Sequence, residues 1–321
     1  MNVYVLALDR VFDTGLATVL DAFETANELA EMFGPPSVRF KVTIVGVRKS
    51  VRTAQGLDVP LRSAGSRAPD LVVVPAIGFK MPDALESALK KPEIEEATEA
   101  LRGWAQQGAM MASACIGTFV MAESGLLDNH RATTTWWLAP LFRKRYPKVD
   151  LDQSSMIVKS GHLITAGAAL GHMDLALWLI RQKSPKLAAL TAKYLIVDSR
   201  PSQSAYVITD HLVHSDPLVE QFEQWVRSCL ASGFSLDQAA IAAGVSKRTL
   251  ARRIQTVLGK SPLSYFQDLR VERAVHLLKT TNASIDEIAT EVGYADGVTL
   301  RALLRRKLGC GIKEIRTSQS T

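Results

Sequence analysis

The last third of this chain carries one sequence pattern twice, with the two copies 49 residues apart. Residues 235–245 read SLDQAAIAAGV, and residues 284–294 read SIDEIATEVGY. Each copy opens with Ser-x-x-Gln or Ser-x-x-Glu, the capping-box signature of a helix start, and then reaches a glycine that can end the helix. A second helical stretch, rich in Arg and Lys, follows each copy. A short helix, a tight turn and a basic helix form a helix-turn-helix, so the sequence predicts two of them, suited to two neighbouring major grooves of DNA.

Charge separates within this part of the chain in a way that favours a polyanionic partner. The whole protein has a net charge of +6 and a pI of about 9.2. Residues 246–260 carry five basic side chains and no acid, and residues 297–307 carry four basic side chains and no acid. The short helices before them hold Asp and Glu. Helices of one sign are an electrostatic footprint for the phosphates of double-stranded DNA.

The DNA contacts are expected on the outer face of each basic helix. In the first motif, Ile241 and Val245 are expected to pack against Leu250 and Ile254, which leaves the polar positions facing outward. Arg can bind guanine through two hydrogen bonds, and Ser or Thr can bind phosphates. One basic face fits a solvated helical bundle equally well, but two capped copies favour DNA binding. The predicted contacts are Ser246, Lys247, Arg248, Thr249, Arg252 and Arg253 in the first motif, and Val298, Thr299, Arg301, Arg305 and Arg306 in the second.

The first 195 residues alternate strand and helix signals. Apolar runs such as 3–8 and 71–74 are typical of strands buried in a parallel sheet, and apolar residues three and four apart, as in 16–30, are typical of amphipathic helices. This alternation predicts an α/β sandwich, flavodoxin-like, around a mainly parallel sheet. Strands are expected at 3–8, 40–44, 71–74, 109–114, 131–135, 155–158 and 163–166, and helices at 16–30, 83–90, 93–107, 117–123, 168–181 and 186–195.

The composition fits two domains of ordinary size. The chain has 321 residues, of which 47% are hydrophobic and 22% charged, enough apolar material for two cores. A polar stretch with a proline and three serines, 198–210, indicates a connector. We therefore expect an α/β domain over 1–195, a linker over 196–212 and an all-α domain with the two helix-turn-helix motifs over 213–321. Helices of the all-α domain are expected at 216–231, 235–243, 246–258, 262–280, 284–292 and 298–308.

Cysteine spacing and hydropathy indicate in which compartment the protein is found and whether it binds a metal or a membrane. The three cysteines are widely spaced and fit neither a disulfide framework nor a zinc pattern, so no metal or cofactor is expected. The sequence enters a strand within a few residues of its start, which does not fit a signal peptide, and no apolar run approaches the roughly 20 residues of a membrane helix. These features predict a cytoplasmic protein with no membrane partner.

Residues 213–316 resemble the DNA-binding domain of the AraC/XylS family. The matching text runs from Gly259 to Tyr265, from Leu269 to Leu278, from Ser284 to Tyr294 and from Arg305 to Gly309. The resemblance implies a transcription regulator, most often an activator that contacts RNA polymerase. The chain departs from the family pattern at Val298, Ala302 and Gly311-Ile312. The second motif is therefore expected to bind its half-site less specifically than the first.

Cys115 marks a second candidate site. It follows the apolar strand 109–114 and precedes a helix, so we expect it at the carboxyl end of the sheet, where a helix N-terminus favours a thiolate. Residues 1–195 resemble the DJ-1/PfpI superfamily, which has the class I glutamine amidotransferase-like fold, at 114–119, 125–127, 131–134 and 174–177. Joined to an AraC-like tail, such a domain resembles the sensor of GlxA- or FtrA-type regulators. That resemblance implies a homodimer controlled by a small-molecule effector, such as an amino acid or an amine.

The residues around Cys115 leave several roles open. Protease-like relatives have His where Ile116 stands, and related regulators have His where Thr135 stands, so a cysteine nucleophile lacks its base and no catalytic residue is predicted. Cys115, Ile116, Thr135 and Trp136 are instead expected to line the effector site, with Trp136 suited to a cationic amine. An inert, buried Cys115 remains an alternative. Two rival functions also stay open: a cysteine-dependent hydrolase or deglycase with a DNA-binding tail, and a nucleoid-type DNA binder with a degenerate sensor.

Overall fold

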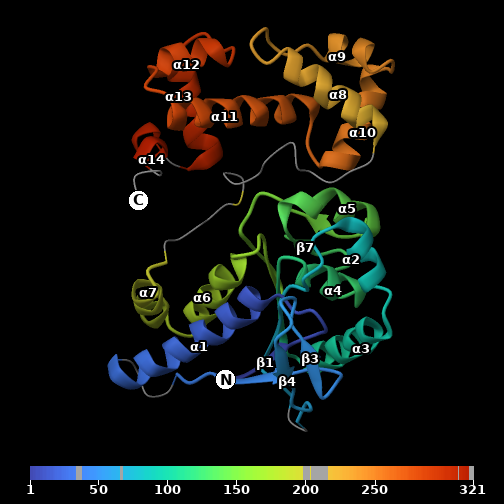
Figure 1. The fold of residues 1–321 in the computed structure, drawn as a ribbon, viewed down its shortest axis with the longest axis vertical. Helices are drawn as coiled ribbons and strands as arrows, with labels where there is room; N and C mark the ends of the chain where they lie inside the picture. Colours follow the sequence, from blue (N-terminus) through green and yellow to red (C-terminus); the bar gives the residue numbers. More distant parts are fainter. Residues whose placement is uncertain (34–37, 66–67, 198–202, 204–215, 310, 318–321) are drawn as a thin grey trace. The chain divides into compact units, whose positions relative to one another are not determined.

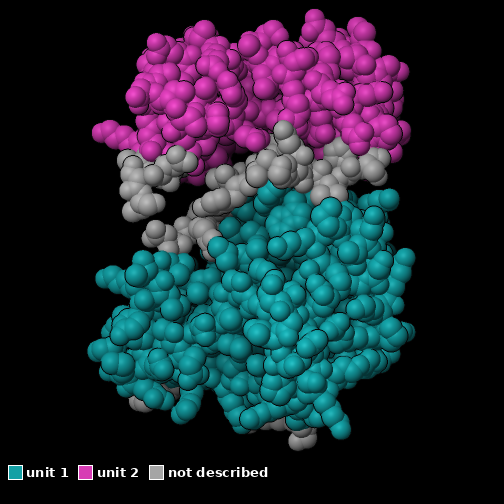
Figure 2. Space-filling model, viewed as in Figure 1, with its two compact units in different colours: residues 1–203 teal, residues 204–321 magenta. Residues whose placement is uncertain are grey.

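The computed structural model describes residues 1–33, 38–65, 68–197, 203, 216–309 and 311–317. The chain divides into two compact units, Met1–Gln203 and Ser204–Thr321 (Figure 2). The first unit is an α/β unit and the described part of the second is helical, so the predicted fold class is confirmed. The predicted linker, 196–212, lies largely outside the described residues, and its limits stay a prediction.

A six-stranded sheet forms the centre of the first unit, in the order β2-β1-β5-β6-β10-β9 (Figure 1). Neighbouring strands are parallel except β9, which runs antiparallel to β10. The mainly parallel sheet expected from the sequence is therefore present. Its strands are β1 (Asn2–Leu6), β2 (Lys41–Val45), β5 (Leu71–Val74), β6 (Met110–Ala114), β9 (Ile157–Ser160) and β10 (Leu163–Ala166).

Helices lie on both faces of this sheet, which explains why β1 and β5 are apolar along nearly their whole length. Three helices, α1, α6 and α7, pack together on one face, and α3 and α4 lie on the other (Figure 1). These helices are α1 (Asp13–Phe33), α3 (Pro92–Gln106), α4 (Gly117–Glu123), α6 (Gly171–Lys183) and α7 (Pro185–Tyr194). A further helix, α2 (Pro82–Ala88), precedes α3.

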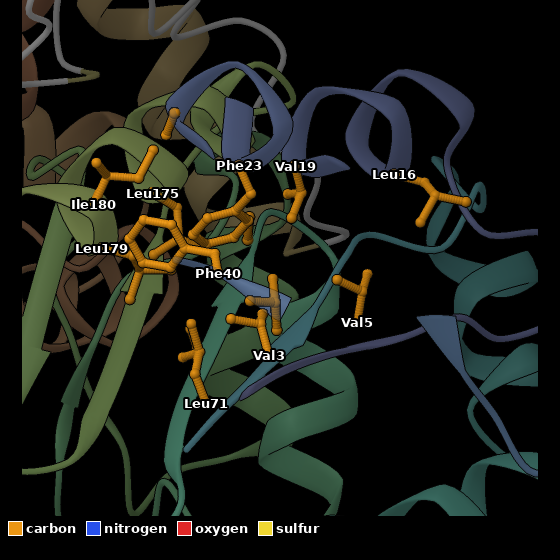
Figure 3. Packing of buried hydrophobic residues seen from close by; sticks show 14 of the residues in the cluster. Val3, Val5, Leu16, Val19, Phe23, Phe40, Leu71, Leu175, Leu179 and Ile180 are labelled. Atoms are coloured by element: carbon orange, nitrogen blue, oxygen red, sulfur yellow. The ribbon is translucent and has the colours of Figure 1, made fainter. Parts of the chain in front are cut away.

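The main core fills the space between the sheet and the layer of α1, α6 and α7. Alternate strand residues such as Val3 and Val5 belong to the same buried cluster as Phe23 of α1 and the residues of α6 (Figure 3). Tyr4, between those two valines, points to the opposite face and meets Trp104 of α3, with ring centroids 5.7 Å apart. Because successive side chains of a strand point to opposite faces, each strand serves both cores.

Several short elements were not expected from the sequence, and all but α5 have only two or three residues, too few positions to show a period. The strand expected at 131–135 is also shorter, ending after Ala132. Its ladder stops there because the Thr133 N–H donates to the Thr165 hydroxyl at 2.7 Å. The shortened strand is β7 (Arg131–Ala132), and the additional elements are β3 (Ser50–Arg52), β4 (Asp58–Pro60), β8 (Asp150–Leu151), a 3-10 helix (Trp136–Leu138) and α5 (Ala139–Arg145).

The second unit consists of helices within three residues of the predicted bounds, with one further helix, α14, at its end. The long α11 joins the two motifs, with α8, α9 and α10 at one end and α12, α13 and α14 at the other (Figure 1). A helix of 19 residues spans about 28 Å, near the ~34 Å between successive major grooves on one DNA face. The helices are α8 (Pro217–Ser228), α9 (Leu236–Ala242), α10 (Lys247–Leu258), α11 (Pro262–Thr280), α12 (Ile285–Glu291), α13 (Gly297–Leu308) and α14 (Ile312–Thr317).

Candidate functional site

The first helix-turn-helix is built from α9 and α10, and each of these helices begins at a serine cap. The hydroxyl of Ser246 accepts the N–H of Thr249 at 3.2 Å, which fixes the start of α10. Leu250 and Ile254 are fully buried, as predicted. Ile241 is not, because 79% of it is exposed. The prediction for Ile241 was wrong: it lies about 200° around α9 from the buried Ala239, so small alanines make the helix contact instead.

The second helix-turn-helix is built from α12 and α13. The capping box predicted for α12 is present, with Ser284 and Glu287 bonding each other's backbone N–H groups. Asp296 caps α13 by accepting the Thr299 N–H at 2.7 Å. The Asp286 carboxylate of α12 accepts the N–H of Gly297 at 2.9 Å, so it ties the first helix of the motif to the start of the second. Local polar contacts thus fix the angle at which α13 projects.

The predicted DNA-contact residues fall into two groups, those with an ionic partner and those without. Lys247 pairs with Asp237 at 2.9 Å, with both side chains exposed. Arg253 pairs with Asp216, the buried cap of α8, and so helps to hold α10 against α8. Among the described residues, no ion pair involves the remaining predicted arginines, all of them exposed: Arg248, Arg252, Arg301, Arg305 and Arg306.

The predicted contacts that are not arginine or lysine lie at the starts of the two helices. Thr249 and Ser246 form the cap of α10, with their hydroxyl oxygens 2.9 Å apart. The Thr299 hydroxyl donates to Asp296 at 3.2 Å. Val298 is 70% exposed although apolar. Val298, Thr299 and Arg306 share a surface groove of about 540 Å3 whose other lining residues are Gln267, Tyr294, Ala302 and Leu303.

Arg270 of α11 connects the two motifs, and sequence reasoning did not single it out for this role. Its side chain is largely buried, and Nε donates to the carbonyl of Leu230, just after α8, at 2.9 Å. The guanidinium lies over the Phe266 ring (4.3 Å) and over the ring of Tyr294 in the second motif (4.9 Å). An arginine in an amphipathic helix normally indicates a solvated face, so no sequence signal distinguishes it. Arg270 therefore joins the turn after α8 to the second motif.

Cys115 lies at the turn between β6 and α4, at the carboxyl edge of the sheet. It has a left-handed backbone, with φ of 56°, a conformation that costs energy in a residue with a Cβ. Its N–H donates to the carbonyl of Ala166 at 2.8 Å, and its own carbonyl accepts the hydroxyl of Thr134 at 2.8 Å. Hydrogen bonds to two other segments thus hold the turn in place.

The thiol of Cys115 is buried, with 2% of the residue exposed. Burial raises its pKa to about 12, while the N–H of Ile116 and the nearby hydroxyl of Thr135 lower it only in part. The N–H at the helix start favours the thiolate as expected, but loss of hydration outweighs it, so the protonated thiol is the favoured form. The structure places Ile116 and Thr135 in the interior with the thiol, and leaves Trp136 half-buried against Trp137, ring centroids 5.6 Å apart.

His172, at the first turn of α6, lies at the same edge of the sheet. Its Nδ1 donates to the Ala169 carbonyl at 2.6 Å, and its Nε2 accepts the N–H of Ala76 at 3.0 Å. Complete burial lowers its pKa to about 4, so the ring is neutral near neutral pH. Both ring nitrogens are hydrogen-bonded to backbone groups, which gives His172 a structural role. In the part of the chain that the structure describes, no three His, Cys, Asp or Glu side chains gather as a metal site, and no helix is long and apolar enough to cross a membrane.

Comparison with known proteins finds relatives for both units. The DJ-1/PfpI family model matches residues 1–182, and a helix-turn-helix domain model matches residues 239–318. The HTH-type transcriptional regulator GbdR of Pseudomonas aeruginosa is 24% identical over 318 residues, 98% of this chain and 83% of GbdR. The HTH-type transcriptional regulator GlxA of Rhizobium meliloti is 26% identical over 217 residues, 61% of each chain. The HTH-type transcriptional activator RhaS of Enterobacter sp. is 31% identical over 127 residues, 40% of this chain and 44% of RhaS.

A DJ-1-like α/β unit followed by two helix-turn-helix motifs defines a class of DNA-binding regulators. The chain belongs to the DJ-1/PfpI family and joins that domain to an AraC-type helix-turn-helix domain, the architecture of AraC-family transcriptional regulators such as GbdR and GlxA. Both resemblances predicted from the sequence are confirmed. The individual DNA and ligand contacts stay predictions.

Proposed function

We propose that this regulator is a transcription activator that binds promoter DNA through α10 and α13 under the control of a small effector. The observation that carries the proposal is the exposed arginine set of the two capped helices, Arg248, Arg252, Arg301, Arg305 and Arg306, none of which is in an ion pair with a described residue. Guanidinium groups that no carboxylate neutralises are available for phosphates and guanine edges. Ser246, Thr249, Val298 and Thr299 complete the proposed contacts at the helix starts.

The effector site is proposed in the DJ-1/PfpI domain, around Cys115, Ile116, Thr135 and Trp136. Ligands of α/β proteins bind at the carboxyl ends of the strands, where Cys115 lies. The hydroxyl of Thr135 is buried beside the Cys115 thiol and makes no other hydrogen bond among the described residues, so it offers a polar contact inside that edge. Binding there would shift the population of DNA-competent states. The same domain is proposed to form the homodimer.

The sign of regulation, the contact with RNA polymerase and the cytoplasmic setting are proposed from the family resemblance. The relative RhaS is named an activator, which supports activation. No enzymatic activity is proposed, because the Cys115 thiol is buried and protonated near neutral pH and Ile116 stands where a base would be needed. Turnover of a peptide or glycated substrate by the wild type, absent in Cys115→Ala, would instead support the hydrolase.

Footprinting of genomic fragments with the full-length protein tests the proposal. The expected result is a discrete protected site of about two helical turns per protomer, because each motif occupies one major groove. Uniform coverage would support the nucleoid-type binder, and no protection at low salt would refute DNA binding. Run-off transcription from a protected promoter then measures the sign, with increased transcript expected.

A further inference from the structure

Gln203 lies in the segment between α7 and α8, and the structure buries it completely in the DJ-1/PfpI domain. Its backbone N–H donates to the carbonyl of Ser154 at 2.9 Å. The side-chain Nε2 faces three acceptors: the Thr133 hydroxyl at 3.1 Å, the Thr134 carbonyl at 3.0 Å and the Ser155 carbonyl at 3.4 Å. A residue predicted to be part of a linker is thus held inside the first unit.

The site fits its occupant imperfectly. An amide nitrogen has two hydrogens to share among three acceptors, one of which, the Ser155 carbonyl, also accepts from the Thr133 hydroxyl at 3.1 Å. The amide oxygen, Gln203 Oε1, is buried and has no hydrogen-bond partner among the described residues. Leaving a buried acceptor unpaired is unfavourable. A primary ammonium group has three N–H donors and no acceptor, so it matches these three oxygens better than a carboxamide does.

Room for this side chain depends on Gly167, which follows β10 at the carboxyl edge of the sheet. A Cβ at Gly167 would lie 2.3 Å from Nε2 and 2.6 Å from Oε1 of Gln203, so a side chain at that position would force the Gln203 amide to shift. The site also adjoins the turn at Cys115. The same Thr134 that accepts from Gln203 donates its hydroxyl to the Cys115 carbonyl at 2.8 Å. The site around the Gln203 amide therefore lies at the edge of the sheet where the effector is proposed to bind.

We propose that Thr133, Thr134 and Ser155 form the subsite for a primary ammonium group of the effector, and that Gln203 occupies this subsite when effector is absent. This inference rests on the proposed effector control. An effector that takes the subsite displaces the side chain of Gln203, which lies in sequence between α7 and α8. Both states are then linked to effector binding, because only one of the two groups can donate to the same three oxygens at a time. The chemistry selects primary amines over quaternary amines, which have no N–H.

Chemical rescue of the full-length protein tests the subsite. Gln203→Ala removes the occupant and leaves the three acceptors, so methylammonium chloride should raise the midpoint of thermal unfolding of the sensor by about 2–4 °C relative to sodium chloride of equal ionic strength. Wild type should gain less, because its tethered side chain competes. Tetramethylammonium chloride should shift neither protein. Equal shifts in wild type and Gln203→Ala, or no shift with methylammonium, would overturn the proposal.

Two further variants test the inference without opening a cavity. Gln203→Lys places a tethered ammonium at the acceptors and should match or exceed the wild-type midpoint, whereas Gln203→Met is similar in size, offers no donor and should lower it. A lysine variant no more stable than the methionine variant would refute the ammonium preference. Binding of a DNA duplex is measured on the same proteins so that the two proposals fail separately. Absence of DNA binding by the wild type would refute the proposed function. The thermal shifts alone test the subsite.

Discussion

Asp268 of α11 accepts a hydrogen bond from Lys307 of α13, with 2.7 Å between Oδ1 and Nζ. The other carboxylate oxygen accepts from Lys260, which follows α10, also at 2.7 Å. One carboxylate therefore ties the far ends of α10 and α13 to the helix between them. It also neutralises two of the lysines counted in the acid-free stretches 246–260 and 297–307.

Asp268→Asn is expected to loosen both motifs and to destabilise the second unit by about 2 kcal/mol, because the three charged groups are mostly buried and the lysines would lose their partner. Asp237→Asn is the matched control, since its pair with Lys247 is exposed and should contribute well under about 1 kcal/mol. Urea denaturation followed by circular dichroism measures both. Equal effects of the two substitutions would contradict the structural role of Asp268.

Arg248 and Arg253 lie on the same helix but are expected to respond differently to substitution. Arg248→Ala removes an arginine with no ion pair among the described residues, so it should relax base preference at one position by about 1–3 kcal/mol without changing stability. Arg253→Ala removes the partner of the buried Asp216 and should lower stability. Binding to a library of operator variants, together with denaturation curves, separates the two effects. An unchanged sequence profile for Arg248→Ala would exclude it from base recognition.

The salt dependence of DNA binding should distinguish basic side chains that contact phosphate from those already held in an ion pair within the protein. If Arg305 contacts a phosphate, Arg305→Gln should reduce the slope of log affinity against log salt by about 0.9. Lys307→Gln is the control from the same helix turn, and its slope should be unchanged because Asp268 already holds that ammonium. Fluorescence anisotropy with a labelled operator over a salt series provides the slopes. A smaller slope in the Lys307 variant alone would mean that Lys307, and not Arg305, contacts the phosphate.

Cys115 is expected to resist alkylation in the folded protein. With its pKa raised to about 12, the thiolate fraction near pH 8 is about 1000-fold lower than for an ordinary thiol of pKa 9. The raised pKa stabilises the fold below about pH 9, and that stabilisation is lost as pH rises from about 9 toward 12. Iodoacetamide labelling followed by peptide mass spectrometry, with and without urea, measures the difference. Rapid labelling of native Cys115 would contradict the buried thiol and favour a reactive role.

His172 is expected to make the DJ-1/PfpI domain acid-labile. Its folded pKa of about 4 lies below the ordinary 6.5, so its contribution to stability is complete above about pH 6.5 and lost as pH falls toward 4. A shift of that size corresponds to roughly 3 kcal/mol. His172→Gln should flatten the dependence of unfolding free energy on pH in this range. His162→Gln, at an exposed position, should leave it as in the wild type. Identical pH profiles for all three proteins would refute the assignment.

Local sequence signals determined most of the architecture. The helix bounds of the second unit, the capping box at Ser284 and the apolar strands follow from residues close together in the chain, because caps and periodicity act over one or two turns. For the same reason the sequence alone predicts the duplicated motif and the outward-facing arginines of its basic helices. Ile241 was misjudged because apolar character says nothing about whether a neighbouring helix reaches that side.

Tertiary structure decided which of those side chains are available and which are buried. Arg253 and Lys307 meet Asp216 and Asp268, acids 37 and 39 residues away in the chain, so no local count of charge could separate them from the unpaired arginines. Burial of the Cys115 thiol and of the Gln203 amide likewise depends on distant segments folding over them. Ion pairing and loss of hydration are set by distances in space, and a sequence gives those distances only where the chain is locally regular.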